Sequence, residues 1–356
     1  MSSNSQLLNK LVAAAHSVGA TDIHLSAGRL PRVRIDGSLQ DLGDVATGAL
    51  ASDAIDALAH QISGDAYAKL EEQGEVDLAV TAADVRCRIN IYRAQGDYAM
   101  AIRLLADSIP PLASLGLPPA VLEFPHLTRG IVLVTGETGS GKSTTLASVL
   151  NQINQERSVH IVTLEDPIEY LYEPARASID QREVGKDTIS FASGLRSVLR
   201  QDPDIILIGE MRDTETIEAA LTAAETGHLV FATLHTASAA ESIDRLVGVF
   251  PAERQPQIRM QLSTTLEAVL TQQLLPAKEG PGRALACELM VVNPAIRNLI
   301  REGKTPQIAN TIATSAEEGS ITFDNMLIRM VRAGQISATT AQEAAHDRDY
   351  VSRGLH

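Results

Sequence analysis

The sequence predicts an α/β protein whose main core is a parallel sheet, with a smaller α+β domain before it and a mostly helical region after it. After residue 120, four continuous apolar runs are typical of strands buried on both faces of such a sheet, and amphipathic helical stretches alternate with them. A cluster of prolines separates this part from an earlier stretch of mixed helix and strand patterns.

The composition excludes several classes of protein. The chain has 356 residues, with 44 acidic and 30 basic side chains and a formal net charge of −14. Hydrophobic residues make up 44% of the chain, which is enough to bury a core and argues against wholesale disorder. No apolar run approaches the roughly 20 residues of a membrane span, and the N-terminus lacks a signal-peptide pattern. We therefore expect a soluble, cytoplasmic protein.

Two further features of the composition bear on ligands. The two cysteines, Cys87 and Cys287, are too few for a four-cysteine zinc site and are expected as core thiols. The acidic balance disfavours stable binding to nucleic acid, which needs clustered Lys and Arg to displace counterions.

Residues 1–106 are expected to form the small α+β domain. Helical spacing predicts helices around 7–15 and 55–62, and β-prone runs predict the strands 22–25, 32–36, 76–80, 86–91 and 99–104. Four of the 15 prolines then fall between Pro110 and Pro119, and each fixes φ and removes a backbone donor. This predicts a stiff linker over residues 107–119.

The second domain is expected to cover residues 120–356. Its apolar runs predict buried strands at 131–134, 160–164, 205–208 and 229–232, and the intervening spacing predicts helices around 146–153 and 217–224. Such alternation is typical of right-handed parallel crossovers. From about residue 256 the pattern is mostly helical, with one predicted strand at 284–292.

The strongest motif follows the first of these strands. It matches G-x-x-x-x-G-K-[ST] and lies between a predicted strand and a predicted helix, which is the context of a phosphate-binding loop. Its glycines allow backbone N–H groups to converge on phosphate oxygens, and the helix start adds a positive dipole end. Lys142 is expected on the β and γ phosphates and Ser143 on Mg²⁺. The residues are Gly136, Glu137, Thr138, Gly139, Ser140, Gly141, Lys142, Ser143 and Thr144.

Polar side chains follow the other three predicted strands. Glu165 follows strand 160–164, Glu210 follows strand 205–208, and His235 follows the fourth strand. Because the carboxyl ends of parallel strands meet at one edge of a sheet, these side chains should gather near the phosphate loop. His228 begins the fourth strand and should lie at the opposite end.

Carboxylates in such a place can hold Mg²⁺ or polarise an attacking water. We expect Glu210 to activate water, Glu165 to support the metal through water, and His235 to sense the γ-phosphate. The alternatives are a helix-start acid for Glu210, a turn residue for Glu165 and a capping or core histidine for His235.

The first domain carries a group of arginines. Guanidinium groups suit phosphate contacts, and an arginine supplied from another domain or subunit is a common device in phosphoryl transfer. The alternative for each is an ordinary solvated arginine. The group consists of Arg86, Arg88, Arg93 and Arg103.

Taken together, these motifs resemble the type IV pilus retraction ATPases, the twitching-motility branch of the type II/IV secretion ATPase family. The most selective mark is Ala-Ile-Arg-Asn-Leu-Ile-Arg-Glu at residues 295–302, which is similar to the hallmark of the retraction branch. The resemblance runs nearly end to end, through residues 19–25, the phosphate loop, 165–169 (the Asp box), 204–213 (Walker B) and 226–236 (the His box).

The resemblance implies a PAS-like first domain, a RecA-like second domain and a homohexameric ring with ATP at subunit interfaces. It also implies that first-domain arginines reach the nucleotide. Arg88 and Arg103 match the family positions, whereas the intervening family arginine aligns with Gly96, with Arg93 three residues earlier. His228 falls within the His box, so the resemblance implies a functional role for it. Its place at the start of the strand does not indicate such a role.

The function that the resemblance implies is a motor that hydrolyses ATP to disassemble a pilus. Its partner would be an inner-membrane platform protein, and its place the cytoplasmic face of that membrane. The alternatives within the family are pilus-extension and type II secretion ATPases, which usually carry a tetracysteine module that two cysteines cannot form, and an accessory retraction paralogue. Outside it they are a nucleic-acid translocase and a non-catalytic nucleotide-gated scaffold, for which Glu210 is an awkward feature.

Overall fold

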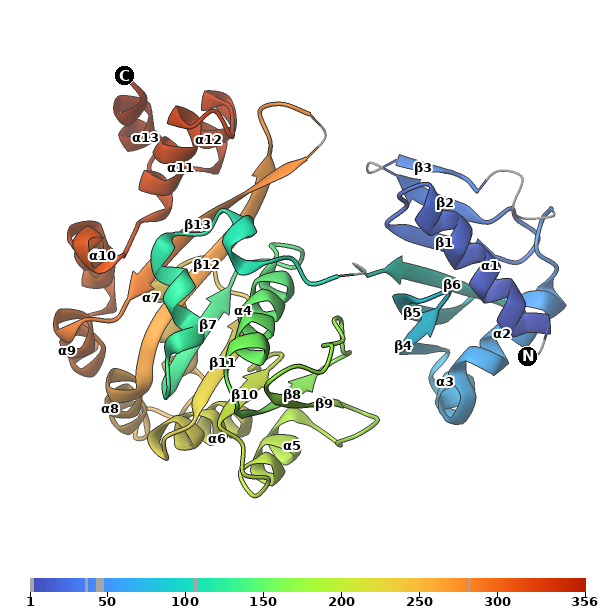
Figure 1. Cartoon of the computed structure of the whole chain (residues 1–356), viewed down its shortest axis with the longest axis horizontal. Helices are drawn as coiled ribbons and strands as arrows, with labels where there is room; N and C mark the ends of the chain where they lie inside the picture. The colour runs from blue at the N-terminus through green and yellow to red at the C-terminus, as the bar shows by residue number, and fades with distance from the viewer. Residues whose placement is uncertain (1–2, 36–37, 43–47, 106–107, 281) are drawn as a thin grey trace. The chain divides into compact units, whose positions relative to one another are not determined.

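The computed structural model describes residues 3–35, 38–42, 48–105, 108–280 and 282–356 (Figure 1). The chain divides into two compact units, one made of residues 1–109 and 167–171 and the other of residues 110–166 and 172–356. Among the described helices, none is long and apolar enough to cross a membrane.

The first unit is a six-stranded antiparallel sheet in the order β3-β2-β1-β6-β5-β4. Side chains along β5 alternate between buried and partly exposed, because successive residues of a strand point to opposite faces. Helices pack on the buried face. The elements are α1 (Ser3–Ser17), β1 (Asp22–Ser26), β2 (Arg32–Ile35), β3 (Ser38–Asp41), α2 (Ser52–Ser63), α3 (Tyr67–Gln73), β4 (Glu75–Ala82), β5 (Val85–Ala94) and β6 (Asp97–Leu104).

The second unit is built on a seven-stranded sheet in the order β13-β12-β7-β11-β10-β8-β9. Its strands are parallel except for the antiparallel pair β12 and β13. The strands are β7 (Gly130–Thr135), β8 (His160–Glu165), β9 (Ser178–Glu183), β10 (Ile205–Ile208), β11 (Leu229–Leu234), β12 (Leu266–Pro276) and β13 (Arg283–Val291).

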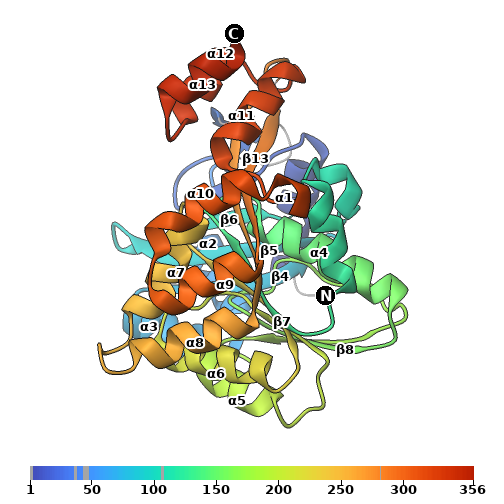
Figure 2. The ribbon, with the colours of Figure 1, turned by 90° about the vertical axis from the view of Figure 1, so that its left-hand side faces the viewer.

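Helices cover both faces of this sheet. Along β7, Ile131 and Leu133 join the hydrophobic core cluster that includes side chains of α6, whereas Val132 and Val134 join the cluster that includes α4. Figure 2 shows α7, α8, α9 and α10 close together, and each contacts at least one of the others. The helices are α4 (Lys142–Glu156), α5 (Phe191–Val198), α6 (Thr214–Glu225), α7 (Ala239–Gly248), α8 (Gln255–Thr265), α9 (Pro294–Glu302), α10 (Ile308–Thr314), α11 (Phe323–Arg332), α12 (Ala338–Ala344) and α13 (Arg348–Leu355).

The structure corrects the prediction for the chain after residue 256. A single strand was predicted there, but β12 and β13 together form a long hairpin at one end of the sheet. The apolar residues of β12 also fit helical spacing, so pairing with β7 and β13 decides its conformation. Strands β3 and β9 and helix α3 were not predicted either, and β3 has no buried residue to reveal it.

The proline-rich segment belongs largely to the second unit. Residues from Pro110 onward group with that unit, and two short 3₁₀ helices form at Leu112–Leu115 and Pro119–His126. Leu112 is 3% exposed in the same core cluster as α4. Residues 106 and 107, the last residue of the predicted first domain and the first of the predicted linker, lie outside the described residues.

Candidate nucleotide-binding site

The phosphate loop leaves the carboxyl end of β7 and enters α4 at Lys142. Gly136, Gly139 and Gly141 have φ values of 134°, 80° and 95°, in the region that favours glycine. A Cβ atom on Gly136 would lie 2.3 Å from the backbone oxygen of Gln272 and 2.7 Å from Ser140 Oγ. The backbone path therefore requires glycine at the point where the loop leaves the strand.

The loop presents a cation and a hydroxyl at the start of α4. Lys142 Nζ donates hydrogen bonds to the carbonyl oxygens of Gly136, at 2.7 Å, and of Glu137, at 2.9 Å. The Ser143 side chain is exposed in the first turn of the helix. The free N–H groups of that turn and the helix dipole favour an anion. This geometry suits the binding of phosphate groups.

Glu210 and His235 meet at the same edge of the sheet. His235 Nε2 lies 3.2 Å from Glu210 Oε1. The Thr233 hydroxyl donates to the carbonyl oxygen of Gly209, which ties the end of β11 to the segment after β10. These contacts bring the histidine that follows one strand onto the carboxylate that follows its neighbour.

The backbone at Glu165 lies close to Gly209, the residue that precedes Glu210. A Cβ atom on Gly209 would lie 3.0 Å from the Leu164 carbonyl oxygen and 3.4 Å from Glu165 Cα, so the two strand ends approach closely. The Glu165 carboxylate accepts hydrogen bonds from Thr163 Oγ1, at 2.7 Å, and from Gln181 Nε2, at 3.1 Å. The β8 and β9 strands thereby orient the carboxylate that the sequence placed at this edge.

Opposing influences act on the pKa of Glu210. Burial raises it, but hydrogen bonds and charges from Arg212 and His235 outweigh burial and leave the pKa below its usual value. Arg212 Nε lies only 2.6 Å from Glu210 Oε1. The carboxylate is therefore ionised at neutral pH, as a proton acceptor must be. Sequence reasoning missed Arg212, although it stands two residues after Glu210.

His228 lies at the other end of β11. Its backbone precedes Leu229, which pairs with Gly130, whereas Leu234 pairs with Thr135 beside the phosphate loop. At about 3.3 Å per residue, the strand separates the two ends by roughly 20 Å. His228 Nδ1 lies 2.9 Å from the Ala223 carbonyl oxygen at the end of α6. This position matches the geometric expectation and gives the histidine a contact at the end of a helix.

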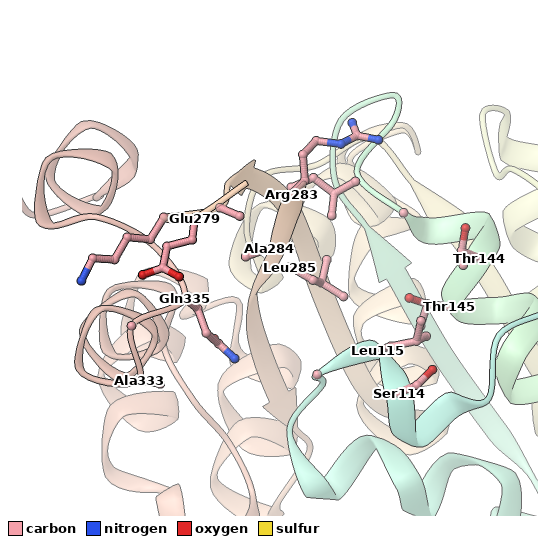
Figure 3. A pocket seen from close by; sticks show the side chains of 16 residues that line it. Ser114, Leu115, Thr144, Thr145, Glu279, Arg283, Ala284, Leu285, Ala333 and Gln335 are labelled. Carbon is pink, nitrogen blue, oxygen red and sulfur yellow. The ribbon is translucent and has the colours of Figure 1, made fainter. Parts of the chain in front are cut away.

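A pocket of about 820 Å³ opens beside the start of α4 (Figure 3). Thr144 and Thr145 line it on the side of the phosphate loop, and residues of β12, of β13 and of the segment that follows α11 line it elsewhere. Its position and size suit the base and sugar of a nucleotide whose phosphates lie on the loop. The lining residues are Ser114, Leu115, Gly116, Gly141, Thr144, Thr145, Leu274, Ala277, Lys278, Glu279, Arg283, Ala284, Leu285, Ala333, Gly334 and Gln335.

Most of this lining comes from segments that carry no recognisable motif. Residues 114–116, 277–279, 283–285 and 333–335 come from separate segments of the sequence, and the fold of the second unit gathers them. The hairpin of β12 and β13 supplies much of the wall. Because that hairpin was not predicted, sequence reasoning could not have found the pocket.

In the first unit, Arg88 and Arg103 face each other across β5 and β6. They are direct partners in the register, so their side chains share one face of the sheet. Arg103 is also opposite Asp22 on β1, with Nε 3.0 Å from Asp22 Oδ1, and Asp22 is opposite Arg34 on β2. Like charges directly opposite each other are destabilising. A row that holds three arginines suits an anionic partner, and the sequence did not single out Arg34.

Arg93 belongs to a different, local cluster. Its Nη2 donates to Glu71 Oε1 at 2.7 Å, and its guanidinium lies 5.2 Å from the centroid of the Tyr98 ring. Gly96, which aligns with the family's middle arginine, has a φ of 94° in the two-residue turn between β5 and β6. The turn explains the glycine, and the cluster gives Arg93 a structural role within the unit.

The residues at the edge of the second sheet offer a few oxygen ligands that suit Mg²⁺. The exposed hydroxyl of Ser143 and the carboxylates of Glu165 and Glu210 are oxygen donors of the kind that Mg²⁺ prefers. Within the described ranges there is no cluster of three His, Cys, Asp or Glu side chains that could hold a metal ion.

The loop, the carboxylates beyond the strand ends and the adjoining pocket define a P-loop nucleotide-binding protein of the α/β class. A family model described as "Type II/IV secretion system protein" matches residues 2–280. The chain belongs to this family.

Individual relatives show which members of the family this chain is similar to. The type IV pilus retraction ATPase PilT of Pseudomonas aeruginosa is 45% identical, over 95% of this chain and 98% of its own length. The type IV pilus ATPase PilU of the same bacterium is 34% identical, over 92% of this chain and 86% of its own length. A crystal structure of the pilus retraction motor PilT with bound ADP matches with a TM-score of 0.90 at 46% identity, covering 97% of this chain and 99% of that one.

These findings confirm the family that the motifs predicted and the α/β fold with its smaller N-terminal and helical C-terminal parts. They also confirm an ATPase that uses a nucleotide. The roles of individual side chains stay predictions.

Proposed function

We propose that this chain is the motor ATPase of type IV pilus retraction, working as a homohexamer with ATP and Mg²⁺. The observation that carries the proposal is the nearly full-length match to a pilus retraction ATPase at 45% identity. The geometry of the phosphate loop and of Glu210 supports hydrolysis rather than a nucleotide-gated scaffold.

The chain's own residues divide the work of hydrolysis. Lys142, which lies on the carbonyl oxygens of Gly136 and Glu137, would exchange these partners for phosphate oxygens. Glu210, whose lowered pKa keeps its carboxylate ionised at neutral pH, would orient the attacking water and accept its proton. Ser143 would hold Mg²⁺ with support from Glu165, and the ion when bound would neutralise charge on the phosphates.

Contacts around Glu210 also suggest how nucleotide is sensed. His235 lies 3.2 Å from Glu210 Oε1, so a shift of the carboxylate toward water would move or release the histidine. Arg88 and Arg103 would stabilise charge on the phosphates of a neighbouring subunit in the ring. The shared face of these two arginines supports their acting together.

The proposed partner is an inner-membrane platform protein of the pilus machinery, met at the cytoplasmic face of the membrane. The second candidate is an accessory retraction ATPase, since the relatives also include a second type IV pilus ATPase, PilU, at 34% identity compared with 45% for the retraction ATPase PilT. An extension or type II secretion ATPase and a nucleic-acid translocase remain weaker alternatives.

Deleting the gene and counting surface pili tests the proposal. We expect excess pili and loss of retraction, with normal numbers restored by the wild-type gene but not by Lys142→Ala. The variant should have lost nucleotide-dependent activity, because the substitution removes the positive charge of the lysine that contacts the β and γ phosphates. Cells without pili would instead indicate an extension motor, and normal retraction with Lys142→Ala would refute the site.

A further inference from the structure

A buried polar seam runs between β12 and the phosphate loop. Thr135, the last residue of β7, and Thr271 on β12 are register partners whose hydroxyl groups lie 2.9 Å apart. The next residue of β12, Gln272, is 2% exposed. Burying an amide costs free energy unless it is hydrogen-bonded, so this side chain is expected to have a specific partner.

That partner is the first turn of α4. Gln272 Nε2 donates a hydrogen bond of 2.8 Å to the hydroxyl of Thr145, which is itself 1% exposed. Thr145 stands three residues after Lys142 on the helix. The side chain of Gln272 therefore fixes the helix at the end of the loop that carries the lysine.

The backbone of Gln272 contacts the opposite end of the loop. Its carbonyl oxygen lies 2.3 Å from the point that a Cβ atom on Gly136 would occupy, and Ser140 Oγ lies 2.7 Å from the same point. Gln272 thus touches the loop where it leaves β7 and, through Thr145, where it enters α4.

An apolar residue would serve packing alone at least as well. Leu270 and Leu275 on the same strand are buried among apolar neighbours. Gln272 Oε1 and Ser140 Oγ are buried and have no hydrogen-bond partner within the described structure. An amide kept here at that cost points to a role in the loop rather than in the core.

We propose that Gln272 is a positioning residue that holds the phosphate loop and the start of α4 in the geometry that binds nucleotide phosphates. The inference rests on the proposed nucleotide site and goes beyond it to the strand that shapes the site. Because β12 also supplies Leu274 to the pocket, and Ala277 follows directly after the strand, β12 would align the phosphate and nucleoside parts of the site.

The test compares Gln272→Leu with Gln273→Leu, the same substitution at the exposed next position of the strand. ADP is the probe for affinity by calorimetry, ATP hydrolysis gives kcat and KM, and thermal unfolding without nucleotide reports stability. We expect Gln272→Leu to weaken ADP binding roughly tenfold, about the value of one lost hydrogen bond to an ordered loop, and to change its melting temperature no more than the control does. The control should bind ADP normally.

Thr145→Val tests the same hydrogen bond from its other side. We expect the double variant to bind ADP no more weakly than the worse single variant, because both substitutions remove one interaction. If Gln272→Leu fails to fold, Gln272→Met decides, because it keeps the unbranched side chain without the amide, and it should weaken ADP binding. Unchanged ADP affinity in the folded variant, or additive losses in the double variant, would overturn the proposal.

Lys142→Ala separates this inference from the proposed function. If Lys142→Ala loses ADP while Gln272→Leu keeps it, the nucleotide site stands and only the positioning role fails. If neither substitution affects ADP, the nucleotide site itself is misplaced.

Discussion

Arg212 contributes most to lowering the pKa of Glu210. The arginine is an exposed residue that pairs with a carboxylate only 19% exposed, and burial of that carboxylate works against the pairing. Removing the guanidinium would leave His235 alone to oppose the effect of burial, which raises the pKa of Glu210. The consequence concerns both the rate of hydrolysis at low pH and the stability of the fold.

Arg212→Gln should shift the acid limb of the kcat/KM profile to higher pH. The pKa of Glu210 is lowered in the wild type, so the stability that its ionised form contributes is present above the unfolded pKa and is lost as pH falls through the folded pKa. The value of kcat/KM also falls as pH drops through the folded pKa, because a protonated carboxyl cannot accept a proton. In the variant this loss should begin at higher pH. Arg196→Gln, which breaks the exposed Arg196–Glu215 pair, is the matched control and should leave the profile unchanged.

Glu210→Gln completes this comparison. It should abolish the acid limb and slow hydrolysis on the order of 10²–10⁴-fold, the usual effect of losing a positioned base. An acid limb that stays in place in Arg212→Gln but disappears in Glu210→Gln would show that Arg212 does not tune the carboxylate. Persistence of the limb in Glu210→Gln would make Glu165 the better candidate for the base.

Among single residues, the sequence predicted the carboxylates that follow strands but not the side chains that contact the site from other strands. Glu165 and Glu210 are found at one sheet edge because parallel strands end there, which is a rule of topology. Gln181 and Gln272 contact the site from β9 and β12, and neither strand was predicted. Their partners depend on strand order, which no local pattern encodes.

At the scale of elements, Glu288 on β13 links two helices. Its carboxylate accepts a hydrogen bond of 2.9 Å from the backbone N–H of Ala239, the first residue of α7, and another from Phe323, the first residue of α11. Burial raises the pKa of Glu288, and these bonds and the nearby His346 oppose that shift, while Asp324 adds to it. The helix after the His box and a C-terminal helix therefore share one acceptor.

Glu288→Gln should remove a pH-dependent destabilisation while keeping an oxygen acceptor. The pKa of Glu288 is raised in the folded protein. The stability that its protonated form contributes is therefore fully present below the unfolded pKa and is lost as pH rises through the folded pKa. The stability of Glu288→Gln relative to the wild type should thus increase with pH, by at most about 1.4 kcal/mol per pH unit.

Chemical unfolding of both proteins between about pH 4.5 and 8 measures this difference. Glu343→Gln, at an exposed position of α12, is the control and should follow the wild type at each pH. Parallel curves for the wild type and Glu288→Gln would show that the carboxyl does not titrate in this range.

The strands and helices that could be predicted are those with buried, periodic patterns. The strands β7, β8, β10 and β11 have apolar runs that only a doubly covered sheet explains. Strand β3 is exposed throughout and gives no such pattern. Strand β12 is apolar at spacings that suit either conformation, and its long-range pairing decides between them.

At the scale of the whole molecule, the charge is unevenly distributed. The chain carries a net charge of −14, yet Arg34, Arg88 and Arg103 share a row across the sheet of the first unit, with Asp22 between two of them. Arg103 pairs with Asp22 and Arg88 Nε lies 3.8 Å from Asp77 Oδ1, so these carboxylates offset part of the repulsion between the two opposed arginines, and an anionic partner would offset more of it. The proposed ring supplies such a partner in the nucleotide of another subunit.

Hydrolysis should then depend on assembly. Turnover per chain should rise steeply with protein concentration, and Arg103→Ala should lower kcat while leaving ADP binding largely intact. An ordinary surface arginine would instead change stability by no more than about 0.5 kcal/mol and leave the rate unaltered. Arg245→Ala, on the second unit's helix α7, provides a comparison for a substitution outside the arginine row.

Mixing Arg103→Ala chains with Glu210→Gln chains identifies which subunit supplies each group. If the arginine and the glutamate of one site come from different subunits, some interfaces in mixed rings regain both groups, and hydrolysis returns in part above the level of either variant alone. If one chain supplies both groups, every site lacks one of them and the mixture stays as slow as its components. Hydrolysis by a monomer at a rate independent of concentration would contradict a ring-dependent mechanism, because no neighbouring arginine could then take part.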